Sequence, residues 1–232
     1  MSRRDELESG LARVRERIAH AAAAAGRSAD EVRLVVVTKY FPASDVRLLT
    51  DLGVRDVGEN RHQEAEAKSA EVAQEGLRWH FIGGLQSNKA AAVARYADVV
   101  ESVDRAKVVA PLARGAQERG GVLDVLLQVS LDPPGADHRA GCAPSDLPAL
   151  AERVTAEDSL ALRGLMAVAP LGEDPGVAFA RLGEIRASFL ERFGEATDLS
   201  AGMSGDLEAA IAHGATHVRV GSAVLGERPL IK

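Results

Sequence analysis

The sequence has few aromatic residues, a single cysteine, no excess of basic charge and no long apolar run, and each absence excludes a class of function. Aromatic side chains make up 3% of the 232 residues, too few for the stacking platforms that bind single-stranded nucleic acids. The net charge of −6 argues against binding to a phosphate backbone, because no segment requires a basic face. No nucleic-acid partner is therefore expected.

Signals that would send a chain into or across a membrane are also missing. The first residues, from Met1 to Glu6, carry mixed charge without an apolar core, so no secretory signal is expected. No run approaches the roughly 20 apolar residues that a membrane-spanning helix requires. Cys142 is the single cysteine and has no partner for an internal disulfide, which agrees with a reducing compartment. We expect a cytoplasmic protein without a membrane partner.

The most informative stretch is a short apolar run that ends in a lysine. Residues 34–37 are apolar without alternation, which is typical of a strand buried on both faces of a parallel sheet. Pro42 cannot donate to a sheet ladder, and Ser44 or Asp45 can cap a helix, so a strand-turn-helix unit is predicted. Lys39 would then lie at the carboxyl end of a strand, where α/β folds bind ligands. Lys39 is either a desolvated nucleophile able to form a Schiff base, or a lysine that is solvated or paired to a carboxylate.

Strand and helix patterns alternate along the whole chain. An amphipathic helix over residues 3–25 precedes the first strand, and residues 28–31, although spaced like a capping box, are interpreted as a turn. Eight strand-helix units without a composition shift predict one domain, 1–232, folded as a TIM-type (β/α)8 barrel with an extra N-terminal helix. A doubly wound open sheet is the alternative, because spacing does not show closure. The further strands are predicted at 54–58, 78–83, 99–103, 122–130, 160–168, 197–201 and 217–220, and the further helices at 44–52, 60–74, 87–96, 104–119, 144–154, 177–193 and 204–213, with a loop over 132–137.

Polar residues follow several of the predicted strands, and a closed barrel would bring them to one mouth. Ser204 lies where a helix is predicted to begin, and Gly221 with Ser222 follows the last strand. Loops after the seventh and eighth strands of such barrels commonly bind phosphate through backbone N–H groups. Taken singly, Ser204 is a helix cap and Gly221 a turn glycine. Taken with Lys39, they predict a phosphate site that faces an amine.

The sequence lacks the motifs of nucleotide binding, metal binding and paired-carboxylate hydrolysis. Residues 83–89 have neither the spacing nor the final Ser or Thr of a P-loop. His213 and His217 are four apart, but Gly214 breaks the helix that would align them as metal ligands. Glu59 has no second carboxylate nearby in sequence, so a paired-carboxylate hydrolase is unsupported. No metal site is predicted.

Six ordered motifs, spread from near the start to near the end, resemble those of the pyridoxal-phosphate homeostasis proteins. They are VVTK at 36–39, GENRHQE at 58–64, WHFIGGLQSNK at 79–89, LRGLM at 162–166, LSAGMS at 199–204 and VRVGSAVLG at 218–226. That family resembles the barrel domain of alanine racemase, which is fold type III of the pyridoxal 5'-phosphate (PLP) proteins, and it binds PLP as a Schiff base. The resemblance assigns the Schiff base to Lys39, the phosphate to Ser204 and the backbone of Gly221 and Ser222, the vicinity of the pyridine nitrogen to Arg219, and the lining of the ring to Asn60 and His80.

The residue at the pyridine nitrogen bears on activity. A guanidinium has no acceptor, so it does not keep the ring nitrogen protonated as a carboxylate would, and the ring is a weaker electron sink. The racemases of this fold add a second base from another domain, for which the residues up to Lys232 leave no room. We therefore expect a PLP carrier with little or no turnover, and we expect it to be a monomer. The resemblance implies a role in balancing free PLP against apo-enzyme recipients, which agrees with a carrier. The alternatives are a small PLP-dependent amino-acid racemase and a Schiff-base aldolase that uses Lys39 without cofactor; a pure interaction protein has little support.

Overall fold

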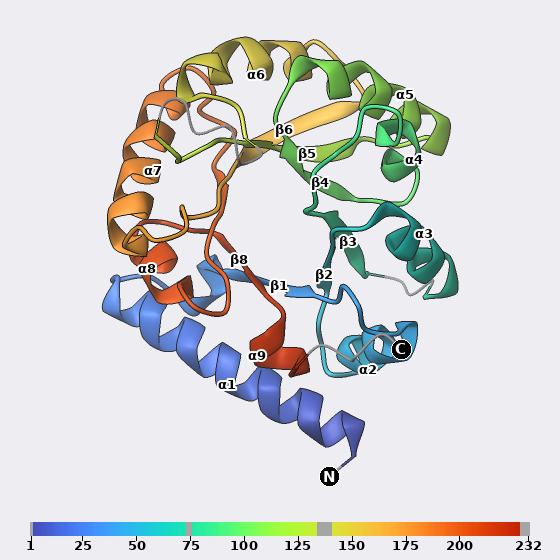
Figure 1. The fold of residues 1–232 in the computed structure, drawn as a ribbon, viewed down its shortest axis with the longest axis vertical. Coiled ribbons are helices and arrows are strands. Elements are labelled where there is room, and N and C mark those ends of the chain that lie inside the picture. Colours follow the sequence, from blue (N-terminus) through green and yellow to red (C-terminus); the bar gives the residue numbers. More distant parts are fainter. Residues whose placement is uncertain (1, 73–75, 134–140, 228–232) are drawn as a thin grey trace.

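The computed structural model describes residues 2–72, 76–133 and 141–227, and eight parallel strands within them close into a barrel. Each strand pairs with the next one along the chain, and Val36 of the first strand pairs with Val220 of the last. The predicted TIM-type barrel is therefore confirmed, and the open-sheet alternative is wrong because the sheet has no edge. Figure 1 shows the strands at the centre of the molecule, surrounded by helices. The strands are β1 (Arg33–Val37), β2 (Asp56–Glu59), β3 (Arg78–Phe81), β4 (Val99–Val103), β5 (Leu123–Gln128), β6 (Leu160–Met166), β7 (Asp198–Ser200) and β8 (His217–Val220).

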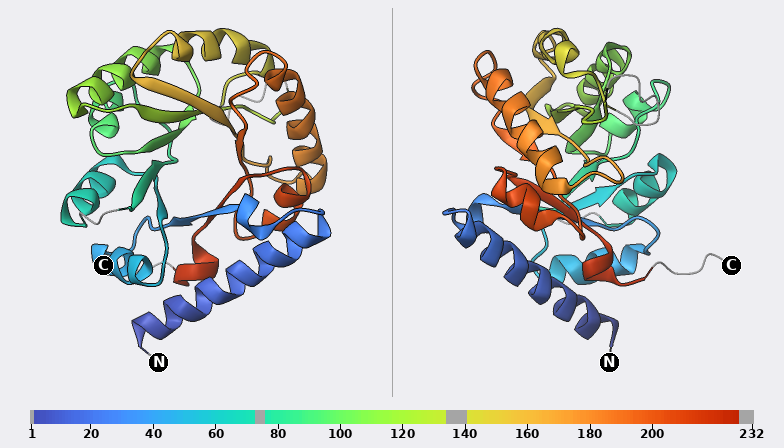
Figure 2. Two further views of the ribbon diagram at one scale, coloured as in Figure 1. Left: turned by 180° about the vertical axis from the view of Figure 1, so that it is seen from behind. Right: turned by 60° about the vertical axis from the view of Figure 1, so that its left-hand side comes forward.

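The helices lie outside the barrel, and most of them connect one strand to the next (Figures 1 and 2). Within the described residues, none has the length and apolar content that a bilayer crossing requires. The end of the helix predicted for 60–74 and most of the loop predicted for 132–137 lie outside the described residues. The α-helices are α1 (Arg3–Ala24), α2 (Ala43–Asp51), α3 (His62–Glu71), α4 (Ala90–Ala94), α5 (Val109–Arg119), α6 (Leu147–Thr155), α7 (Pro175–Leu190), α8 (Leu207–Ala212) and α9 (Ser222–Leu225), with 3-10 turns at Ala29–Glu31, Ala106–Val108 and Pro144–Asp146.

Alternate residues of the strands point to opposite faces, and the two faces differ in chemistry. The outward residues pack with the helices in two large apolar clusters, one around β1, β2 and α1 and the other around β4 to β7. The inward face has a much smaller apolar cluster, formed by Val99, Leu126 and Met166. Buried inward positions on neighbouring strands are polar, as at His80 and Arg219. The barrel interior is therefore divided between an apolar part and a polar part, which belongs to the site described below.

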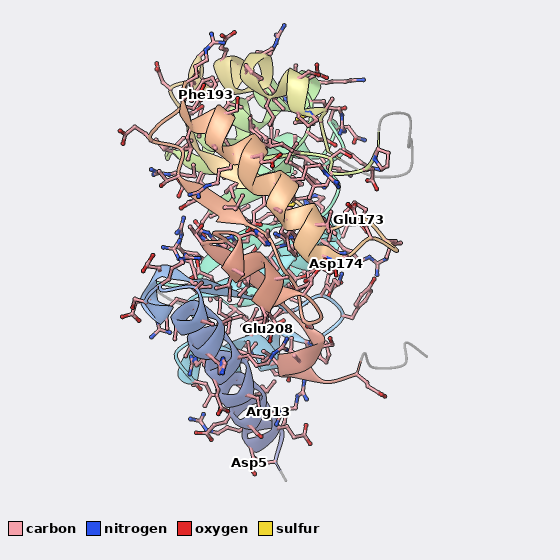
Figure 3. All side chains as sticks on the ribbon, turned by 90° about the vertical axis from the view of Figure 1, so that its left-hand side faces the viewer. Asp5, Arg13, Glu173, Asp174, Phe193 and Glu208 are labelled. Atoms are coloured by element: carbon pink, nitrogen blue, oxygen red, sulfur yellow. The ribbon has the colours of Figure 1, made fainter. Side chains whose placement is uncertain are left out.

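The predicted N-terminal helix is α1, and it packs against α8, α9 and α2 outside the barrel. Its apolar stripe is buried, and a capping box between Ser2 and Asp5 holds its first turn. Arg17 of α1 bonds both carboxylate oxygens of Glu208 on α8, at 2.6 and 2.9 Å. Figure 3 shows Glu208 beside α1, and it shows Glu173 and Asp174 at the amino-terminal end of α7. The helix thus braces the strand-helix units that close the barrel.

Two local predictions were wrong and a third was incomplete. Residues 28–31 form the predicted turn, a 3-10 turn before β1, but they also form the capping box that was discounted, since the Ser28 and Glu31 side chains cap each other's backbone. Neither Ser44 nor Asp45 caps α2: Pro42 is the N-cap residue, and Asp45 instead binds the Arg3 guanidinium at 2.7 Å. A helix was expected to begin at Ser204, but α8 begins at Leu207. The Asp206 carboxylate accepts from the Met203 backbone N–H at 2.5 Å and holds this segment as a turn.

Candidate functional site

Lys39 lies in a tight turn just beyond the carboxyl end of β1. The turn is closed by a hydrogen bond from the Phe41 N–H to the Thr38 carbonyl, at 3.1 Å. Tyr40 adopts a left-handed conformation, with φ of 71°, which is uncommon for a residue with a side chain. The Glu64 carboxylate accepts from the Tyr40 N–H at 2.6 Å and so stabilises this conformation. The placement of Lys39 beyond the strand end agrees with the prediction.

A buried lysine on α3 holds the residues on both sides of Lys39. The Lys68 ammonium donates to the Thr38 carbonyl at 2.8 Å and to the carboxylates of Glu59 and Glu64, each at 2.7 Å. The Thr38 hydroxyl also donates to Glu59, at 2.7 Å. We call these four side chains together with Tyr40 the Lys68 cluster. Burial raises the pKa of Glu59, although the charge and hydrogen bond of Lys68 oppose that rise. The sequence reasoning missed this cluster; the Glu64 to Lys68 spacing on a helix was the available signal.

A cavity of about 260 Å³ lies at the mouth of the barrel, beside Lys39. This volume is just below the range of about 300–1,000 Å³ that pockets for small molecules span. Its walls come from segments that follow β1, β3, β7 and β8, which are far apart in the sequence. The lining residues are Val37, Lys39, Phe41, Ile82, Met203, Ser204, Gly205, Arg219, Gly221, Ser222 and Gly226. The structure thus brings together five of the seven residues predicted to bind the cofactor.

Two hydroxyls and a close backbone approach form one end of this cavity. The Ser222 hydroxyl donates to the Ser204 hydroxyl at 3.3 Å, although the two residues follow different strands. A Cβ atom on Gly221 would lie 3.1 Å from the Val37 carbonyl oxygen, so a side chain there would be crowded. Gly202, with φ of +90°, would place a Cβ 2.6 Å from that of Ala210. Gly221 thus lets the turn after β8 approach β1, and Gly202 lets the segment after β7 approach α8.

Arg219 forms the inner wall of the cavity and is buried. Its guanidinium donates to the Ser200 hydroxyl at 2.7 Å and to the Ala167 carbonyl at 2.9 Å. Burial lowers the pKa of Arg219, and the charge of Glu101 opposes that change. A guanidinium only donates hydrogen bonds, so the group that it meets in the cavity must be an acceptor.

Behind Arg219 a chain of polar side chains crosses the interior of the barrel. Glu101 accepts from the Ser200 hydroxyl at 2.6 Å, and its other oxygen lies 2.7 Å from Nδ1 of His80. Nε2 of His80 lies 2.9 Å from the Asp56 carboxylate. We call Asp56, His80, Glu101, Ser200 and Arg219 the interior chain. All five are buried, so acids and bases alternate where water does not reach.

The two carboxylates decide the protonation of the interior chain. Burial lowers the pKa of His80, but its hydrogen bonds to the Asp56 and Glu101 carboxylates outweigh burial and leave the pKa raised above 6.5. Burial raises the pKa of Glu101, but His80, Arg219 and Ser200 together lower it to about 2. Both shifts favour the charged forms. Glu101 was missed in the sequence, although an acid within a buried apolar strand requires a partner.

The lowered pKa of Glu101 predicts that the fold loses stability at acid pH. Because the pKa of Glu101 falls from 4.5 to about 2 on folding, its contribution is complete above pH 4.5 and is lost as the pH falls towards 2. The contribution of His80, whose pKa is raised, is complete below pH 6.5 and declines above its folded pKa. We expect the difference in unfolding free energy between the natural protein and Glu101→Gln to shrink by roughly 2–3 kcal/mol from pH 5 to pH 2. Urea unfolding across this range measures it, and a constant difference would contradict the assignment.

Two predicted residues do not line this cavity. His80 lies inside the barrel, between Asp56 and Glu101, and is not among the residues that line the cavity. Asn60 lines a neighbouring cavity of about 430 Å³, together with Arg61 and Lys89. Its Oδ1 is buried and has no hydrogen-bond partner among the described residues. The sequence placed these residues near strand ends, and the structure distributes them between this cavity, a neighbouring cavity and the barrel interior.

The donors around the cavity determine what it can hold. Lys39 supplies an amine, Ser204 and Ser222 supply hydroxyls, and Arg219 supplies a guanidinium. Such a set suits a ligand with an anionic group, an electrophilic carbon and a ring acceptor. Within the described part of the chain, no group of three or more His, Cys, Asp or Glu side chains could hold a metal ion.

Known proteins of similar sequence cover nearly the whole chain. The sequence profile of the alanine racemase N-terminal domain matches residues 10–229. The pyridoxal phosphate homeostasis protein of Mycobacterium tuberculosis is 44% identical over an alignment 248 positions long, which covers 98% of this chain and 95% of that protein. The pyridoxal phosphate homeostasis protein of Escherichia coli K12 is 37% identical over an alignment 241 positions long, which covers 98% of this chain and 99% of that protein.

Solved structures show the same barrel. PipY of Synechococcus elongatus PCC7942, solved with PLP bound, matches with a TM-score of 0.82 at 35% identity, over 95% of this chain and 100% of that one. Alanine racemase of Clostridium difficile matches with a TM-score of 0.72 at 14% identity, over 97% of this chain and 57% of that one. The second likeness is one of fold alone.

Proposed function

This chain belongs to the family of the pyridoxal phosphate homeostasis proteins, and we propose that it binds PLP at the mouth of its barrel as a releasable intracellular store. One observation carries the proposal: an amine, two hydroxyls and a buried guanidinium converge on a single cavity from β8 and from the segments after β1, β7 and β8. PLP has an aldehyde, a phosphate and a pyridine nitrogen, and the cavity offers an amine for the first, hydroxyls for the second and a guanidinium for the third. The donor set therefore fits the cofactor.

Each group of PLP is assigned to residues of this chain. The Lys39 amine is assigned to the aldehyde, and the Lys68 cluster holds the turn that presents it. The hydroxyls of Ser204 and Ser222, with the backbone at Gly221, are assigned to the phosphate, because the glycine leaves room for close approach. Arg219 is assigned to the pyridine nitrogen, which accepts a hydrogen bond. Asn60 and His80 are assigned no contact with the ring, because they do not line this cavity.

We also propose that the protein holds PLP without robust turnover. PLP, when bound, supplies an aldehyde that condenses reversibly with an amine and a ring that withdraws electrons. Arg219 donates to the ring nitrogen but does not keep it protonated, so the ring accepts electrons weakly. Apo-enzymes that require PLP would be the recipients. The proposal includes a monomeric state and a cytoplasmic location, and the single cysteine agrees with a reducing compartment.

The proposal is tested with the purified protein. After incubation with PLP and gel filtration, we expect a visible absorbance band, and borohydride reduction should add PLP to the peptide that contains Lys39. Pyridoxal, which lacks the phosphate, should bind at least tenfold more weakly, since charged hydrogen bonds to the phosphate are missing. Incubation with L-alanine should yield no D-alanine at ordinary enzyme rates. A colourless protein, or an adduct only on other lysines, contradicts PLP binding at this cavity; rapid racemisation contradicts the storage role.

A further inference from the structure

Glu101 is the acid at the centre of the interior chain, and both of its oxygens are engaged. It is 0% exposed, and its relation to Arg219 is mostly indirect: the nearest guanidinium nitrogen is 3.8 Å away. Between the two groups stands the Ser200 hydroxyl, 2.6 Å from Glu101 and 2.7 Å from Arg219. Glu101 thus acts on Arg219 chiefly through one hydroxyl.

The carboxylate decides which way this hydroxyl points. An ionised carboxylate only accepts hydrogen bonds, so the single hydroxyl proton of Ser200 must go to Glu101. The Ser200 oxygen then presents its lone pairs to Arg219 and accepts from Nη1. The Ala167 carbonyl accepts from Nη2, so the plane of the guanidinium is fixed at two nitrogens. A neutral side chain at position 101 could donate to Ser200 instead and would remove this constraint.

We propose that Glu101 is a positioning residue for the cofactor: acting through Ser200, it orients the Arg219 guanidinium toward the pyridine nitrogen of PLP. This inference rests on the proposed function and adds to it two residues that do not line the cavity. His80 and Asp56 complete the arrangement, because Nδ1 of His80 contacts the other oxygen of Glu101 and Nε2 contacts Asp56. In this proposal the interior chain orients the hydrogen-bond donor for the ring nitrogen.

A purely structural role for Glu101 makes a different prediction. If the carboxylate only fills and stabilises the barrel, its loss lowers the affinity for every ligand of the cavity by the same factor. If it positions Arg219, its loss affects only ligands that have a ring nitrogen. The informative quantity is therefore the ratio of two affinities measured on the same protein.

The test compares PLP with the analogue in which the ring nitrogen is replaced by a CH group. The natural protein should bind PLP about tenfold or more tightly than the analogue, because a hydrogen bond from a charged donor is lost. In Glu101→Gln we expect the ratio to fall below about threefold, mainly through weaker binding of PLP. Ser200→Ala removes the connecting hydroxyl with a smaller change in volume and should give the same result even if Glu101→Gln folds poorly. Titration of visible absorbance gives all the dissociation constants.

The matched control removes an acid elsewhere in the same barrel. Asp124 on β5 binds Arg78 and Arg163 at 2.7 and 2.6 Å, so Asp124→Asn also leaves arginines without their carboxylate. Asp124→Asn should keep the same ratio of affinities for PLP and the analogue as the natural protein. An unchanged ratio in both Glu101→Gln and Ser200→Ala overturns the inference, and so does a natural protein that binds both ligands equally. If the natural protein binds neither ligand, the proposed function itself fails.

Discussion

Replacing Lys39 with alanine is expected to abolish covalent retention of PLP while leaving the barrel folded. Lys39 is the lysine that lines the cavity beside the two hydroxyls and the Arg219 guanidinium. Without its amine, the phosphate and ring contacts remain, but no other lysine among the described residues lines the cavity to form an imine. The variant should lose its visible absorbance on dialysis, and borohydride should add no mass to it. Circular dichroism should match that of the natural protein, because residue 39 follows β1 and lies outside the strand ladder.

A second lysine on the same side of the barrel provides the control. Lys89 precedes α4 and lines the neighbouring cavity with Asn60 and Arg61. Lys89→Ala should therefore retain the colour and the adduct on Lys39. If Lys39→Ala stays yellow after dialysis, or if borohydride still fixes PLP at a stoichiometry near one, the amine that holds the cofactor lies elsewhere and the assignment of the site is wrong.

The largest effect on stability is expected from replacing Lys68 with methionine. The Lys68 ammonium is buried and engages Glu59, Glu64 and the Thr38 carbonyl. Removal of one partner of a buried ion pair leaves the other charge uncompensated and costs about 3–5 kcal/mol. In a chain of this size, the melting temperature should fall by roughly 6–20 °C. Differential scanning fluorimetry and urea unfolding measure the effect.

Neutralising the Glu59 carboxylate that Lys68→Met leaves unpaired should recover part of the lost stability. Glu59 is 1% exposed and bonds Lys68, so Lys68→Met combined with Glu59→Gln leaves no unpaired carboxylate at that position. The double variant should be more stable than Lys68→Met alone. The exposed Lys107 serves as the control, since Lys107→Met should change stability by no more than about 0.5 kcal/mol. Equal melting temperatures for Lys68→Met and Lys107→Met would show that the cluster contributes nothing.

The residues that line the cavity illustrate why part of the site could be predicted. Lys39, Ser204, Arg219, Gly221 and Ser222 each lie at or just beyond the end of a strand pattern that is clear in the sequence. The carboxyl ends of parallel strands in a closed barrel meet at one mouth, so the order of elements was enough to bring them together. The sequence did not show that His80 meets Asp56 and Glu101 in the barrel interior and does not line the cavity, because those contacts come from distant strands.

Residues that support the site from behind were not predicted. Glu101 meets Ser200, which is 99 residues further along the chain, and Glu59 meets Lys68 across the gap between β2 and α3. The pairing of buried acids with bases depends on the register and tilt of the strands. Neither can be deduced from the spacing of residues in the sequence. The expected caps of α2 failed similarly, because Arg3 on α1 attracts Asp45.

The sequence alone determined the eight strand-helix units, the lysine after the first strand and the glycine-serine turn after the last, since these follow from local patterns of apolar, small and polar residues. Only the tertiary structure decided that the sheet closes, that β8 pairs with β1, and that the barrel interior carries an ionic chain to Arg219. The physical reason is that a charge can be buried only where a specific partner reaches it, and the partner is chosen by packing in three dimensions.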